Sequence, residues 1–319
     1  MLDFFAETAQ FLLKYGIYII DVVLAFFGYF LTKTSRLPAS FLQRITQLLV
    51  TIVYPCLIFS ALTSYFRVEL LLASWDMPLV LVALMGSGFA IGLIARNFAP
   101  MKHWPSDIRN SFIFMAAMPN YVFIPLMITQ AFWGVDETAF LILTSFGGDL
   151  FLWLIAIPTL GSRGQWLKPF LKPPVLALIA AISIILADKN WIFDQLEPLH
   201  PFLQGLGSFT VPLSMFVLGS YLGSQAFTSA GLRSQMVLTG VRLLLTPLIC
   251  GLILFASDWD PVKTRVIFLI STMPTAIASA ILAKLFQGNP AYCAQQVLIS
   301  HVLALLSVPL WLYWGTYFF

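Results

Sequence analysis

Two Met-Pro pairs stand in the middle of apolar segments that otherwise have the composition of long helices. The first reads Met118-Pro119-Asn120-Tyr121 and the second Met273-Pro274-Thr275. An interior proline removes a helical hydrogen bond and costs about 3 kcal/mol, so each pair predicts a helix that stops and starts again. We expect the second halves to start near Tyr121 and near Ala276. The second half of a broken helix begins with free N–H groups and a partial positive charge, which together favour an anion. Asn120 and Thr275 directly follow their prolines, and we expect them to add side-chain hydrogen bonds.

The segments around these pairs are too apolar for a protein in water. The chain has 319 residues, 60% hydrophobic and 10% charged, and its mean hydropathy is +0.90, whereas globular proteins average about 25% charged residues. A bilayer core about 30 Å thick is crossed by a helix of about 20 apolar residues. We therefore expect an all-α integral membrane protein with ten transmembrane helices. Their expected ranges are 10–32, 40–62, 75–95, 107–132, 136–160, 173–188, 201–223, 234–256, 262–287 and 290–316.

The landmarks of the first half recur in the second half at a nearly constant spacing. Because five spans separate each pair, the two halves cross the membrane in opposite directions. The sequence therefore predicts a 5+5 inverted repeat, 1–160 and 173–319, the plan of many secondary transporters. Both Met-Pro breaks then fall near the bilayer midplane, approached from opposite sides. The matching landmarks are Pro55 with Pro212, Pro119 with Pro274, Pro158 with Pro309, and Gly134 with Gly288.

Basic residues are unevenly divided between the two sets of loops, and such residues set the orientation of a membrane protein. Placing both termini outside leaves only Arg67, Lys189, Lys263 and Arg265 in external loops. We therefore expect a multi-pass protein of the cell (inner) membrane with both termini extracytoplasmic. The loops facing the cytoplasm would hold Lys33, Arg36, Arg44, Arg96, Lys102, Arg109, Arg163, Lys168, Lys172 and Arg233.

The stretch 118–134, MPNYVFIPLMITQAFWG, resembles the fourth helix of the auxin efflux carrier family, which includes the plant PIN proteins and prokaryotic organic-acid carriers. The segments 148–158, 211–222 and 271–310 also resemble that family, in the same order along the chain. The long hydrophilic central loop of many plant members is absent. The chain therefore looks like a bacterial-type relative of the PIN proteins.

This resemblance implies that the broken fourth and ninth helices cross. It also implies a transport subdomain (helices 3–5 and 8–10) that moves against a scaffold subdomain (helices 1, 2, 6 and 7), which often forms a homodimer. The implied substrates are small organic anions, such as malate, malonate or auxin-like acids. Carried over by position, Pro119 and Pro274 are the crossover prolines and Asn120 is the substrate-facing polar residue. Thr275 departs from the amide expected in some members, and Ser145 stands where many members have an acid.

Several polar residues lie inside the spans. A charge at the centre of a membrane helix has a high free-energy cost, so such residues usually have a structural or functional role. Asp149 and His301 lie in the fifth and tenth spans, as repeat partners. We interpret them either as coupling residues that carry a proton or bind a cation, or as a hydrogen-bonded structural pair. Tyr54 and Cys56 flank Pro55 at an expected break in the second helix, where they either face the crossover or pack in the core.

Three further charges inside the spans are expected to be ordinary. Asp21 fits a scaffold or water-facing position. Arg242 and Lys284 lie near the cytoplasmic edge, where long side chains reach toward water, although Lys284 could also attract a departing anion.

No enzyme, nucleotide or metal motif accompanies these features. The sequence contains no Walker lysine loop, HExxH, GxSxG or paired-cysteine spacing. We predict no cofactor and no resident metal, no nucleic-acid partner, and a proton or a sodium ion as the coupling ion. The predicted function is secondary transport of a small organic anion by alternating access. The alternatives are a sodium-coupled bile-acid-type symporter of the same superfamily and a non-transporting membrane sensor or channel.

Overall fold

The computed structural model describes residues 23–95, 104–161, 172–188, 195, 197–224 and 231–316. Within these ranges the chain is helical and forms no strand, so the predicted all-α class is confirmed. Three shorter apolar helices lie at Val23–Lys33, Phe123–Trp133 and Pro173–Ala187. The arrangement of ten spans as an inverted repeat stays a prediction. Six helices are long and apolar enough to cross a membrane: Ala39–Tyr65, Val68–Ala95, Val135–Thr159, Glu197–Gly223, Leu232–Phe255 and Pro290–Gly315.

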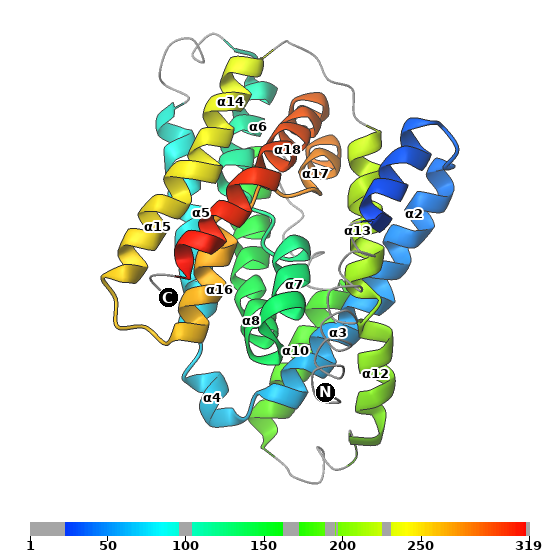
Figure 1. Cartoon of the computed structure of the whole chain (residues 1–319), viewed down its shortest axis with the longest axis vertical. Coiled ribbons are helices and arrows are strands. Elements are labelled where there is room, and N and C mark those ends of the chain that lie inside the picture. The colour runs from blue at the N-terminus through cyan, green and yellow to red at the C-terminus, as the bar shows by residue number, and fades with distance from the viewer. Residues whose placement is uncertain are drawn as a thin grey trace, which may run out of the picture. The chain divides into compact units, whose positions relative to one another are not determined.

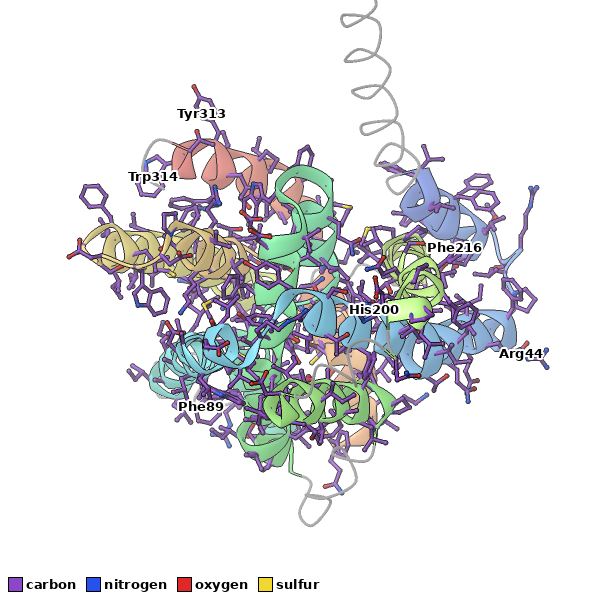
Figure 2. All side chains as sticks on the ribbon, turned by 90° about the horizontal axis from the view of Figure 1, so that it is seen from below. Arg44, Phe89, His200, Phe216, Tyr313 and Trp314 are labelled. Atoms are coloured by element: carbon purple, nitrogen blue, oxygen red, sulfur yellow. The ribbon has the colours of Figure 1, made fainter. Side chains whose placement is uncertain are left out.

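The helices expose apolar side chains. Leu79 is 68% exposed, Leu305 76% and Leu306 70%, although soluble proteins avoid large contiguous apolar surfaces. Aromatic side chains occur near the end of the last helix, where Tyr313 extends outward from the ribbon (Figure 2). These surfaces suit contact with lipid chains, and the protein is a multi-pass membrane protein.

The described chain divides into two compact units, and the first comprises residues 1–68, 126–138 and 172–224. Its central element is α3, on which α10 and α12 both pack. Gly207 at the end of α12 lies against the backbone of Leu57, and Thr63 of α3 shares a 3.1 Å hydrogen bond with His200 of α12. The elements of this unit include α2 (Ala39–Leu48), η1 (Leu49–Val53), α3 (Tyr54–Tyr65), η3 (Thr129–Trp133), α10 (Pro173–Ala187), η6 (Glu197–Leu199), α12 (His200–Gly207) and α13 (Thr210–Gly223).

A pair of glycines on α13 joins that helix to Val23–Lys33. A Cβ atom on Gly219 would clash with the backbone carbonyl of Ala25, and one on Gly223 with the carbonyl of Tyr29. Small residues spaced four apart allow helix backbones to approach closely in membranes, where hydrophobic association between helices is absent. This glycine face therefore holds the two helices of unit 1 together.

The second unit comprises residues 69–125, 139–171 and 225–319. Gly88 and Gly92 of α5 lie against Ala116 and Ile113 of α6 in the same close manner. Figure 1 shows α14 continuing into α15, and α16 beside α15. Its elements include α5 (Asp76–Ala95), α6 (Ser106–Ala117), most of α8 (Val135–Phe151), η4 (Leu152–Ala156), α9 (Ile157–Thr159), α14 (Leu232–Gly240), η7 (Val241–Leu245), α15 (Thr246–Phe255), α16 (Pro261–Ser271), α17 (Ser279–Leu285) and α18 (Pro290–Gly315). Two short helices, α4 (Val68–Leu72) and α7 (Phe123–Ile128), start in one unit and end in the other.

Prolines inside the long helices have two different structural outcomes. Pro55, Pro158 and Pro247 each follow a π-helical turn, at η1, η4 and η7 respectively, and the helix continues through them. A wider turn accommodates the missing N–H group and the bulk of the ring. The expected break at Tyr54–Cys56 is therefore wrong, because Ala39–Tyr65 is one continuous helix. Pro309 lies inside α18 without interrupting it. Pro119 and Pro274, by contrast, lie in non-helical segments.

The two loop glycines expected to match differ in conformation. Gly134 has a φ of +124°, a region that favours glycine. At the second turn the positive φ belongs to Gln287, at +64°, and Gly288 is packed against Leu160. The match of Gly134 with Gly288 therefore does not extend to backbone conformation.

Candidate binding site at the paired helix breaks

Each Met-Pro pair lies in unit 2 and separates two helices. The helix α6 ends at Ala117 and α7 starts at Phe123, while α16 ends at Ser271 and α17 starts at Ser279. The second halves were expected to begin near Tyr121 and Ala276, so the structure places each start a few residues later. Both predicted interruptions are present.

The two interruptions pair with each other through their backbones. The N–H of Asn120 donates to the carbonyl of Pro274 at 2.7 Å, and the N–H of Ala276 donates to the carbonyl of Met118 at 3.0 Å. Pro119 and Thr275 face each other across this antiparallel bridge. Backbone groups away from water must find partners inside the protein, and here each break supplies them to the other. The expectation that these N–H groups are free for a ligand is therefore wrong for Asn120 and Ala276.

The side chain of Asn120 has a hydrogen-bond donor, Nδ2, that is left without a partner by the residues the structure describes. Its side chain is 3% exposed, and its Oδ1 accepts from the N–H of Phe123 at 3.2 Å, which caps the start of α7. Its Nδ2 makes no hydrogen bond to any described residue. A buried amide with an unused N–H group costs stability, so this atom is where an acceptor group of a ligand would be most favourable.

Tyr121 connects the first break to α8. Its hydroxyl donates to Oδ1 of Asp149 at 2.8 Å. The ring lies directly over Gly148, where an added Cβ would come within 2.7 Å of the ring. The residue next to Asp149 is therefore small because the Tyr121 ring occupies the space of a side chain.

Thr275 connects the second break to α18. Its Oγ1 lies 2.7 Å from Oγ of Ser300, and its N–H donates to the same Ser300 oxygen at 3.4 Å. Both side chains are completely buried. Thr275 is thus engaged with the protein in this conformation, and the predicted direct contact with a substrate stays a prediction.

His301 follows Ser300 and is also buried. Its Nδ1 lies 2.8 Å from the carbonyl of Val297, so Nδ1 carries the hydrogen and donates it, while Nε2 has no hydrogen-bond partner among the described residues. The histidine therefore makes no hydrogen bond to Asp149. The interpretation of these residues as a hydrogen-bonded structural pair is wrong, and their role in coupling stays a prediction.

The remaining predicted site residues lie in unit 1 or outside the described ranges. Tyr54 is the first residue of α3 and is buried, and Cys56 is partly exposed on the same helix. Whether they face a substrate stays a prediction. Asp21 lies outside the described residues. Among the residues the structure describes, no group of histidine, cysteine, aspartate and glutamate side chains could hold a metal ion.

Arg242 differs most from expectation. It was expected to reach toward water near the cytoplasmic edge, but its side chain is 0% exposed, within the π-helical turn η7. Lys284 is exposed, as expected for a side chain that extends toward water.

Comparison with known proteins identifies the kind of protein that carries these breaks. The profile of the family described as "membrane transport protein" matches residues 19–165 and again residues 158–312. The chain belongs to this family. Two relatives of this chain illustrate the range of the family. An "uncharacterized transporter" of Methanothermobacter thermautotrophicus is 26% identical over 296 residues, which cover 91% of this chain and 94% of the relative. "Protein PIN-LIKES 2" of Arabidopsis thaliana is 33% identical over 155 residues, 44% of this chain and 34% of the relative.

Membership of the membrane transport protein family confirms the predicted likeness to auxin efflux carriers and identifies the chain as a membrane transporter. Two features of this transporter were not predicted: the contact of Ser300 with Thr275 at the second break, and the burial of Arg242 in η7. The burial of Arg242 could have been predicted from the sequence. Gln235, Thr239 and Arg242 are spaced i, i+4 and i+7, which puts three polar side chains on one face of an apolar helix.

Proposed function

We propose that this membrane transport protein is a secondary transporter of small organic anions, with carboxylates as the substrate class. The observation that carries the proposal is the unpartnered Nδ2 of Asn120 beside the paired breaks. A hydrogen bond from an amide N–H group to an ionised carboxylate oxygen is about twice as strong as one to a neutral acceptor. The start of the helical run Phe123–Trp133 adds a partial positive charge.

Alternating access is the proposed mechanism. The mutual pairing of the two breaks supports the proposal that the fourth and ninth helices cross, because each break supplies the other's missing backbone partners. Unit 2 contains both breaks, Asp149 and His301, and we assign it the role of transport subdomain. Unit 1 contains the helices assigned to the scaffold, which would also form the homodimer contact. The inner membrane and extracytoplasmic termini remain part of this proposal.

Counterflow in proteoliposomes tests the function directly. Vesicles loaded with unlabelled malonate or malate are expected to accumulate a labelled trace of the same acid, with saturation. Empty vesicles and vesicles of the same lipid without protein are the controls. Absence of saturable counterflow with every mono- and dicarboxylate tried would refute the proposal. Ion-like conductance in place of counterflow would identify a channel, and complete dependence on sodium would favour the bile-acid-type symporter.

Replacing Asp149 with asparagine tests coupling. The Asp149→Asn variant keeps an oxygen that can accept from Tyr121 but removes the charge. If Asp149 carries the coupling proton or ion, the variant should still exchange substrate in counterflow but lose the dependence of net uptake on pH or sodium. Tyr121→Phe is the matched control, because it removes the hydrogen bond and keeps the carboxylate. An unchanged pH and ion dependence in Asp149→Asn would remove Asp149 as the coupling residue.

A further inference from the structure

The guanidinium group of Arg242 is enclosed in unit 2, and no described residue supplies an acceptor for it. All three of its nitrogen atoms, Nε, Nη1 and Nη2, lack a hydrogen-bond partner within the described part of the chain, and no described carboxylate forms an ion pair with it. The group carries a full charge and five N–H donors. Burying such a charge without partners is among the most unfavourable arrangements in a protein. A bound anion would accept these hydrogen bonds and neutralise the charge.

Other buried polar side chains lie on the same helical face as Arg242 and form a line along it. On the same helical face, Thr239 accepts a 2.9 Å hydrogen bond from Gln296 of α18, and Gln235 donates to the carbonyl of Tyr292 at 3.3 Å. Gln235 and Gln296 are each 0% exposed, and the Oε1 atom of each lacks a donor among the described residues. Buried polar atoms without partners are rare in folded proteins, so their occurrence along one helix pair points to a space that a polar ligand or water occupies.

A cavity lies at one end of this line of polar residues. This cavity of about 310 Å³ lies at the N-terminal ends of α14 and α18 and is lined in part by Gln235, Tyr292 and Gln295. Further along the same helix, Arg242 lies in η7, which packs against α18. Arg242 is thus a buried cation between the two helices whose N-terminal ends line the cavity.

We propose that Arg242 is the fixed positive charge of an anion site in unit 2 and binds a carboxylate group of the transported solute. This proposal rests on the proposed function and extends its site beyond Asn120. The planar guanidinium presents parallel N–H groups that match the two oxygens of a carboxylate. Its charge is permanent, so binding needs neither a proton nor a metal cation to neutralise the anion.

Thermal-shift titration of the purified full-length protein tests the proposal, with sodium malonate, sodium acetate and sodium chloride as probes. Wild-type protein should be stabilised by a carboxylate, and Arg242→Gln should weaken the apparent Kd about 10- to 100-fold, the loss expected for charge-assisted hydrogen bonds. The matched control is Arg233→Gln, on the same helix at an exposed position, which should bind as wild type does.

Two further variants keep the test decisive if Arg242→Gln does not fold. Arg242→Lys keeps the charge but loses the paired N–H groups, so it should fold and bind more weakly than wild type. Arg242→Met removes a buried charge for which no described residue is a partner, so its ligand-free Tm should equal or exceed that of wild type, whereas replacing a structural arginine would lower the Tm.

The outcomes separate this proposal from the proposed function. Wild-type affinity for the carboxylate in Arg242→Gln or Arg242→Lys would overturn the role of Arg242 and leave the transport proposal intact. Stabilisation by chloride alone, lost in Arg242→Gln, would overturn the carboxylate assignment. Absence of both binding and counterflow in wild-type protein would instead refute the proposed function itself.

Discussion

Replacing Asn120 with aspartate is expected to abolish carboxylate transport while leaving the start of α7 intact. The aspartate keeps an oxygen that can accept from the N–H of Phe123, so the cap at 3.2 Å survives. It replaces the unpartnered Nδ2 with a second acceptor oxygen and adds a negative charge. The loss of a hydrogen bond to a charged group, together with repulsion between like charges, should weaken carboxylate binding by about 100-fold or more.

The Asn120→Ala variant removes both functions of this side chain, the cap formed by Oδ1 and the donor Nδ2. It removes both the cap and the donor without adding charge, so it should cost about 1 kcal/mol of stability. Its affinity for the carboxylate should fall about 10- to 100-fold. Thermal shift measures both effects, and counterflow measures the transport that remains. Wild-type affinity in both variants would exclude Asn120 as a ligand of the anion.

The positions of the two breaks were predictable because the cause is local. A proline inside an apolar helix removes a backbone hydrogen bond whatever the rest of the fold is. Pro119 and Pro274 are both prolines of this kind, and each is followed by a polar residue. The same rule gave a wrong prediction at Pro55, where a π-helical turn absorbs the proline. Local sequence shows that a hydrogen bond is missing, but the surrounding structure decides whether the helix widens or stops.

The family resemblance implied that the two broken helices cross, but the individual hydrogen-bond partners could not be predicted from the sequence. The donation from Asn120 to Pro274 and from Ala276 to Met118 requires two breaks to meet in space. The burial of Arg242 likewise depends on which face of its helix packs against α18, and position within a span does not decide this. The spacing of Gln235, Thr239 and Arg242 did contain that information, because polar side chains in a membrane helix usually face the protein interior.

Alanine substitutions at two adjacent glycines test separately the helix packing near Asp149 and the hydrogen bond that Asp149 accepts. Gly147 and Gly148 lie in α8, immediately before that aspartate. A Cβ atom on Gly147 would overlap the backbone carbonyl of Pro78 in α5, whereas one on Gly148 would meet the ring of Tyr121 at 2.7 Å. The first obstacle is backbone in a packed helix, and the second is a side chain that can rotate.

Gly147→Ala is therefore expected to destabilise the protein by about 3 kcal/mol or more, because overpacking against a rigid backbone forces helices α5 and α8 apart. The measurement is the Tm and the yield of monodisperse protein in detergent. Gly148→Ala should fold with a smaller loss of Tm, but it should displace Tyr121 from Asp149, so its transport should match that of Tyr121→Phe, which also lacks this hydrogen bond. Gly240→Ala is the matched control, since a Cβ there meets no atom within 4 Å. Equal Tm values for Gly147→Ala and Gly240→Ala would contradict the close contact between α5 and α8, because an alanine at Gly147 cannot fit while the carbonyl of Pro78 stays in place.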